Sequence, residues 1–211
     1  MGKLQKIATL CVIIAFILLL VSSKVQEILL TRKTEHAKEP VKISMGTWEE
    51  EFYENHSLGI QFHLPEKWER NANEELATMM NLDKNVDFES AEFQASLSNM
   101  KSIYYVLANN PETGSSLSIF SEKVSDGTTV EKYLVGIKAQ LESLKEFTYQ
   151  IEITDKEKVG KETYATLVAK VSDYGMTQKY YVRKLGDYFI SIIISTLDES
   201  ESIESIIEYF G

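Results

Sequence analysis

An uncharged apolar run, Ile7–Val21, follows Lys3 and Lys6 near the start of the chain. Basic residues stay on the cytoplasmic side of a membrane, so they orient this segment with everything after it outside. Extended to Ser23, the run just reaches the lower limit of about 17 residues for a membrane-spanning helix. As a shorter hydrophobic region, it also fits a secretory signal peptide that is cleaved near Ser23. Residues 1–23 are therefore expected to be an N-terminal signal anchor or signal peptide, with the uncleaved anchor preferred.

Residues 24–47 mix basic and acidic residues with a single proline, Pro40. A solvated tether is the preferred interpretation of this stretch. Ile28–Leu30 leave two alternatives open, in which these residues extend a helix out of the membrane or lie on its surface. The excess of basic residues favours anionic headgroups in the second alternative. We expect the tether to join the membrane segment to one folded domain over 48–211.

Short alternating segments begin with this domain. Ile60, Phe62 and Leu64 alternate with polar residues, which is the period of a half-buried strand. Residues 189–194 are almost entirely apolar, as expected of a central strand that is covered on both faces. Strands are expected at 47–53, 58–64, 103–108, 115–124, 147–154, 164–172, 176–184 and 188–196, with a short piece near Val159.

Segments whose apolar residues recur with the period of a helix lie between and after these strands. Residues 73–80 and 90–100 are expected to be helical, and they form either a lid or a simple crossover. Thr128 with Glu131 makes a capping box before a helix with one apolar stripe. Asp198 with Glu201 makes a second capping box before a closing helix. The inward residues of that closing helix are expected to be Ile203, Ile206, Ile207 and Phe210.

Turn residues at 109–114, 173–175 and 185–187 join consecutive strands as hairpins. Consecutive hairpins predict a mostly antiparallel sheet, and the amphipathic helices are expected to cover its faces. The expected fold class is α+β, with a mostly antiparallel β-sheet flanked by helices in an α/β/α sandwich. This domain follows an N-terminal transmembrane or signal helix.

The distribution of charge limits the classes of partner that the chain can bind. The chain has a net charge of −10, but residues 48–211 hold 15 basic and 29 acidic residues and carry −14. The preceding 47 residues carry +4. A domain this acidic repels phosphate backbones, so nucleic-acid binding is excluded. The single cysteine, Cys11, lies in the apolar run, so the domain has no thiol chemistry and no disulfide.

Two stretches resemble a known family. LGIQFHLPEKW at 58–68 resembles the opening of PsbP-like domains, and QKYYVRKLGDYFISIIIST at 178–196 resembles their closing hairpin. The chain is similar to the exported, uncharacterised Gram-positive branch of this family. The resemblance covers essentially the whole domain. It implies an antiparallel sheet between helices, and a noncatalytic role in docking on a membrane-associated complex or helping to assemble one.

No motif for catalysis, cofactor binding or metal binding stands out, and an enzyme is not expected. His56 and His63 with Glu54 lack the third nitrogen or sulfur ligand of a structural zinc site. The sequence Asn-Pro-Glu-Thr-Gly at 110–114 imitates a sortase signal, but the membrane segment and basic tail that must follow it are missing, so a hairpin loop is expected. Acidic stretches lack the spacing of a calcium loop.

Two tyrosine pairs, Tyr104 with Tyr105 and Tyr180 with Tyr181, lie on expected strands. Alternation places one member of each pair inward and one outward. The outward members offer a possible interaction surface, although cross-strand packing is the commoner role. The expected function is a membrane-anchored extracytoplasmic module that docks on a membrane or exported protein complex. The alternative is an extracytoplasmic domain that binds a small ligand, a lipid or a glycan.

Overall fold

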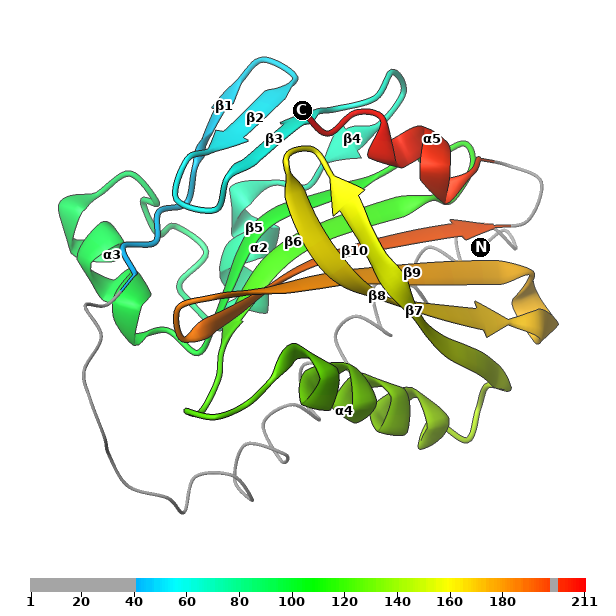
Figure 1. Ribbon diagram of the computed structural model, residues 1–211. Coiled ribbons are helices and arrows are strands. Elements are labelled where there is room, and N and C mark those ends of the chain that lie inside the picture. The colour runs from blue at the N-terminus through cyan, green and yellow to red at the C-terminus, as the bar shows by residue number, and fades with distance from the viewer. Residues whose placement is uncertain (1–40, 198–200) are drawn as a thin grey trace.

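The computed structural model describes residues 41–197 and 201–211 (Figure 1). The predicted membrane segment Ile7–Val21, most of the tether and Asp198 lie outside these described residues. Within them, no helix is long and apolar enough to span a bilayer.

Two antiparallel sheets form the domain. A small sheet has the strand order β1-β2-β3, and a seven-stranded sheet has the order β4-β5-β6-β10-β9-β8-β7. Every strand pair is antiparallel, so the predicted α+β class with a mostly antiparallel sheet is confirmed. The strands are β1 (Thr47–Glu49), β2 (Phe52–Asn55), β3 (Ile60–His63), β4 (Glu69–Arg70), β5 (Ser102–Asn109), β6 (Ser116–Lys123), β7 (Tyr149–Val159), β8 (Glu162–Val171), β9 (Met176–Leu185) and β10 (Tyr188–Leu197).

The helices lie on both faces of the seven-stranded sheet. They are α2 (Asn73–Met79), α3 (Ala91–Ser96), α4 (Val130–Glu142) and α5 (Ile203–Ile207), with single 3-10 turns η1 (Leu97–Asn99) and η2 (Ser172–Tyr174). Figure 1 shows α4 below the sheet, and α5 with the small sheet above it. The helical segments predicted at 73–80 and 90–100 are confirmed.

Contacts between side chains show that α4 and α5 cover opposite faces. Tyr133 of α4 packs against Phe189 of β10, with ring centroids 4.6 Å apart. Glu204 of α5 reaches Lys179 of β9 at 4.0 Å, and Lys179 lies opposite Ile194 of β10. Side chains alternate along a strand, so positions 189 and 194 point to different faces. Strand β10 is therefore buried on both sides, as its apolar run predicted.

Two strand predictions need correction. The strand expected over 47–53 is instead β1 and β2, because the chain turns back at Glu50, whose φ is 53°. The strand expected over 147–154 and the short piece near Val159 are one strand, β7. A bulge between Thr154 and Glu157 interrupts its alternation, which made one strand look like two.

Both predicted capping boxes were assigned to the wrong residue. Helix α4 begins at Val130, and its N-cap is Thr129, whose hydroxyl accepts from the backbone N–H of Lys132 at 3.3 Å. Helix α5 is capped by Ser202, whose hydroxyl accepts from the backbone N–H of Ser205 at 3.0 Å. In each case the pattern matched by spacing, but the residue directly before the first helical turn makes the hydrogen bond.

Replacing Thr129 by alanine is expected to lower the free energy of unfolding by about 1 kcal/mol, because the N–H of Lys132 loses its acceptor. Chemical denaturation of residues 41–211 measures the change. Thr128→Ala is the matched control, since the Thr128 hydroxyl contacts the neighbouring Ser125 hydroxyl at 3.2 Å and does not cap the helix. A larger loss from Thr128→Ala than from Thr129→Ala would restore Thr128 as the cap.

The segment that leads from β4 to β5 is part of the core. Leu76 and Ala77 of α2 are buried, as are Phe93 of α3 and Leu97 of η1. The rings of Phe88 and Phe93 lie 4.9 Å apart. Of the two expectations for this segment, the packing favours a structural crossover over a lid.

Candidate functional site

The hairpin between β5 and β6 has a tightly bonded loop. The side-chain Oδ1 of Asn110 accepts from the backbone N–H groups of Glu112 and Thr113, at 3.0 and 3.3 Å. The backbone N–H of Asn110 donates to the carbonyl of Ser115 at 2.9 Å, and that of Gly114 donates to the carbonyl of Asn110 at 2.8 Å. An asparagine that bonds the backbone two residues on is a common way to fix a turn. The sortase-like stretch is thus a hairpin loop, as predicted.

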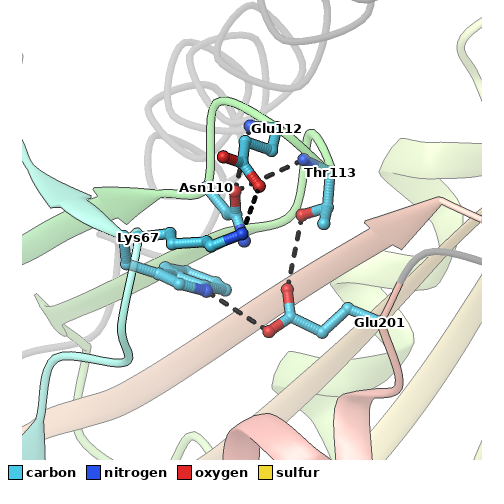
Figure 2. Close-up of polar contacts among 6 residues, drawn as sticks. Lys67, Asn110, Glu112, Thr113 and Glu201 are labelled. Atoms are coloured by element: carbon cyan, nitrogen blue, oxygen red, sulfur yellow. Dashed lines mark hydrogen bonds and ion pairs between the residues drawn. The ribbon is translucent and has the colours of Figure 1, made fainter.

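A carboxylate from the far end of the chain fastens this loop to a second one. Figure 2 shows the Glu201 carboxylate beside the hydroxyl of Thr113. Its Oε1 accepts from Nε1 of Trp68 at 3.3 Å, and its Oε2 accepts from Oγ1 of Thr113 at 3.4 Å. Trp68 is only 5% exposed, so its indole N–H needs a partner within the protein. Glu201 therefore joins the β3–β4 loop, the β5–β6 loop and the start of α5.

An exposed ion pair lies above this carboxylate. Nζ of Lys67 is 2.9 Å from Oε2 of Glu112, and the two side chains are 59% and 62% exposed. The hydrogen bond to the Glu112 carboxylate raises the pKa of Lys67. A pair this exposed contributes little to stability. We call Lys67, Trp68, residues 110–115 and Glu201 the hairpin cluster; it has a buried aromatic base and a charged rim.

The hydroxyl of Thr113 joins two side chains of the hairpin cluster, because it contacts Ser115 Oγ at 3.1 Å besides Glu201. The arrangement is suited to holding a surface in one shape.

The histidines of the described chain lie on the small sheet. Nε2 of His56 is 3.3 Å from Glu54, but the His56 side chain is 87% exposed. His63 packs against Phe52, with ring centroids 4.6 Å apart. The three candidate metal ligands are thus divided between an exposed ion pair and an aromatic contact. Among the described residues, no group of three His, Cys, Asp or Glu is placed to hold a metal ion.

Two buried polar groups hold helices on the sheet. Between α4 and the sheet, the phenol of Tyr133 donates to Glu122, which is only 4% exposed. Burial raises the pKa of Tyr133 well above its usual value, and the neighbouring carboxylate raises it further. On the other face, Nζ of Lys179 lies 2.8 Å from Glu157 and 4.0 Å from Glu204 of α5. These contacts fix the positions of α4 and α5.

The predicted interaction surface of tyrosines is wrong. Tyr104, Tyr105, Tyr180 and Tyr181 are each at most 2% exposed. A bulge between Tyr104 and Val106 breaks the alternation of β5. The hydroxyl of Tyr105 bonds Ser121 at 2.7 Å, and that of Tyr180 donates to Gln178 at 3.2 Å. Tyr180 and Tyr181 do point to different faces, but both faces of the sheet are covered, so neither side chain is accessible.

No family model matches this chain, and no curated protein is significantly similar to it in sequence. Among solved structures, it is similar to the solution structure of cyanobacterial PsbP (CyanoP) from Synechocystis sp. PCC 6803. That similarity has 14% identity and a TM-score of 0.44, and covers 85% of this chain and 97% of the other. A crystal structure from Bacteroides thetaiotaomicron VPI-5482 is similar at 12% identity and a TM-score of 0.34, over 72% of this chain and 44% of that one. At these identities, neither likeness assigns an activity or a partner to this chain.

Proposed function

We propose that this chain is a membrane-anchored, extracytoplasmic and noncatalytic accessory module of the PsbP-like kind, in its exported bacterial branch. Its domain docks on a membrane or exported protein complex through the hairpin cluster. The observation that carries the proposal is the Glu201 carboxylate, which accepts from both Trp68 and Thr113 and so fixes two loops at one end of the sheet.

A fixed loop is a good docking surface for an energetic reason. Binding orders mobile loops and side chains, and that ordering opposes association. Here Asn110 and Glu201 already hold the loop in the unbound protein. The exposed charges of Lys67 and Glu112 then offer contacts at the rim, where charged groups determine orientation and the rate of encounter.

The location follows from the N-terminal segment. Ile7–Val21 anchors the chain in the cell membrane with the domain outside, or is removed by cleavage near Ser23 to give a secreted protein. The net charge of −14 over 48–211 disfavours nucleic acids and favours a protein surface that carries basic residues.

Photocrosslinking tests the docking surface. The tagged full-length chain carries a photoreactive residue at Glu112 and is irradiated in its own membranes. We expect one dominant exported or membrane protein to be captured. The matched control places the same residue at Asp126, which is exposed on the β6–α4 loop away from the hairpin cluster. Capture should fall several-fold at this control position.

Equal capture from both positions would contradict docking through the hairpin cluster. If neither position captures a protein, and a small molecule, lipid or glycan instead raises the Tm of residues 41–211, the alternative ligand-binding function replaces the proposal. If a partner is captured, Lys67→Glu tests the role of the rim charges. Reversing one rim charge is expected to slow association without unfolding the loop.

A further inference from the structure

The chain enters the domain at the end of the sheet opposite the hairpin cluster. Val41, where the described chain begins, lies against the β9–β10 turn: a Cβ atom on Gly186 would be 2.3 Å from its Cγ2. Figure 1 shows this turn and the start of the described chain on the same side, with the β5–β6 loop on the other. Strand β10 runs from Tyr188 at the turn to Leu197, so the two ends are about 30 Å apart.

Four lysines gather at the end where the chain enters. Lys42 follows Val41, Lys184 lies in the last residues of β9, and Lys123 ends β6. Lys101 lies beside Lys123, whose backbone N–H donates to its carbonyl at 2.7 Å. We call Lys42, Lys101, Lys123 and Lys184 the lysine end.

In the loops at the lysine end, acidic residues are fewer than the four lysines. Asp187 pairs with Lys123 at 3.4 Å, and Asp126 is exposed on the adjoining loop. Glu131 is exposed in the first turn of α4, beside the equally exposed Lys132. Glu89 and Glu92 belong to the α3 segment, which Figure 1 places to one side of the turn. The loops between the strand ends therefore carry a local excess of positive charge in a domain whose overall charge is strongly negative.

The other end of the sheet has the opposite balance. Its loops carry Glu112, Glu146, Asp173 and Glu201, against which stand Lys67 and Lys145 in loops and Lys170 near the end of β8. Charge is thus polarised along the strand direction. An anionic surface attracts one end of such a domain and repels the other over about one Debye length, roughly 10 Å.

We infer that the lysine end is a membrane-contact surface whose ligand is the anionic phospholipid headgroup. The inference rests on the predicted anchor and on the proposed function. The part of the tether that precedes the described residues, 24–40, reaches up to about 60 Å when extended, so the anchor alone leaves the domain free to move away from the bilayer. Juxtamembrane lysines are attracted to anionic leaflets. This contact points the hairpin cluster away from the membrane, toward a partner.

Energy transfer to the bilayer tests the orientation. The full chain, with Cys11 replaced by alanine, is inserted into vesicles of phosphatidylcholine, with or without phosphatidylglycerol, that contain an acceptor lipid. A donor dye is attached at Asn99→Cys, which is exposed beside the lysine end, or at Thr148→Cys, which is exposed at the opposite end. We expect phosphatidylglycerol to increase transfer from position 99 well above transfer from position 148, and added salt to reverse the increase.

Charge reversal provides the decisive comparison. On phosphatidylglycerol vesicles, Lys42→Glu with Lys101→Glu is expected to lower the ratio of domains that contact the bilayer to domains that do not by about tenfold or more. It spares Lys123 and Lys184, whose Nζ groups donate to the carbonyls of Ser98 and Thr128. The matched control, Lys145→Glu with Lys170→Glu, makes the same charge change at exposed positions of the other end and should leave transfer from position 99 unchanged.

Transfer from position 99 that is the same with and without phosphatidylglycerol would overturn the inference. An equal loss in the control variant would also overturn it, because net charge alone would then explain the result. The assay contains lipid and no partner protein. Its failure is therefore distinguishable from failure of the proposed docking function, which the crosslinking at Glu112 measures separately.

Discussion

Phe62→Ala is expected to lower the free energy of unfolding by about 3–5 kcal/mol. Phe62 is 0% exposed in β3 and packs against Phe210, with ring centroids 4.8 Å apart. The two residues also form a β-bridge, and the backbone N–H of His63 donates to the carbonyl of Tyr209 at 2.9 Å. Truncation leaves a cavity between the small sheet and the C-terminal segment that follows α5. Chemical denaturation of residues 41–211 measures the loss.

Phe52→Ala is the matched control for this experiment. Phe52 lies opposite His63 in the same small sheet, but its side chain is only partly buried. Its truncation is expected to cost clearly less, since less apolar surface returns to water. Similar losses from the two variants would show that the contact between β3 and the C-terminal segment contributes nothing special to stability.

Phe62 also shows what the sequence predicts well. Phe62 and Ile60 alternate with Gln61 and the exposed His63, and this period correctly identified a strand with one buried face. The same local rule located most of the strands, because side-chain alternation depends only on the geometry of a single strand. The β9–β10 hairpin was predictable for a similar reason, since a short turn at Gly186 with a φ of 61° forces adjacent strands together.

The rule failed where the answer depended on distant parts of the chain. Alternation predicted that Tyr180 and Tyr181 point to different faces, and they do. It carried no information on whether a helix or a second sheet covers each face. For Tyr105, even the direction was lost, because a bulge at this position of β5 resets the alternation.

The hairpin cluster was only half predictable. The sequence 109–114 signalled a turn, because asparagine, proline and glycine each favour turn conformations. The bond from Trp68 to Glu201 joins residues 133 positions apart, and no local pattern marks such a pair. A weak signal did exist: a tryptophan shortly after Pro65 has an indole N–H that requires a partner once it is buried.

The two proposals give the two ends of the domain different tasks. The lysine end lies where the described chain enters the domain, and the hairpin cluster lies a strand length away. A domain held at the bilayer by one end presents the other at a fixed height, which restricts the search for a membrane-bound partner. The rigid sheet between the ends, with β10 buried on both faces, transmits this orientation.

Trp68→Ala is expected to lower the free energy of unfolding by about 3–5 kcal/mol, because a nearly buried indole is removed from the core. Trp68→Phe keeps most of the packing and removes the donor to Glu201, so a loss of about 1 kcal/mol is expected. A double-mutant cycle with Glu201→Ala separates the two effects. If the carboxylate acts as a clamp, Glu201→Ala costs less in the Trp68→Phe protein than in the parent, with a coupling of about 0.5–1.5 kcal/mol. Strictly additive losses would mean that Glu201 does not fasten the two loops, and the docking surface would then lose its structural basis.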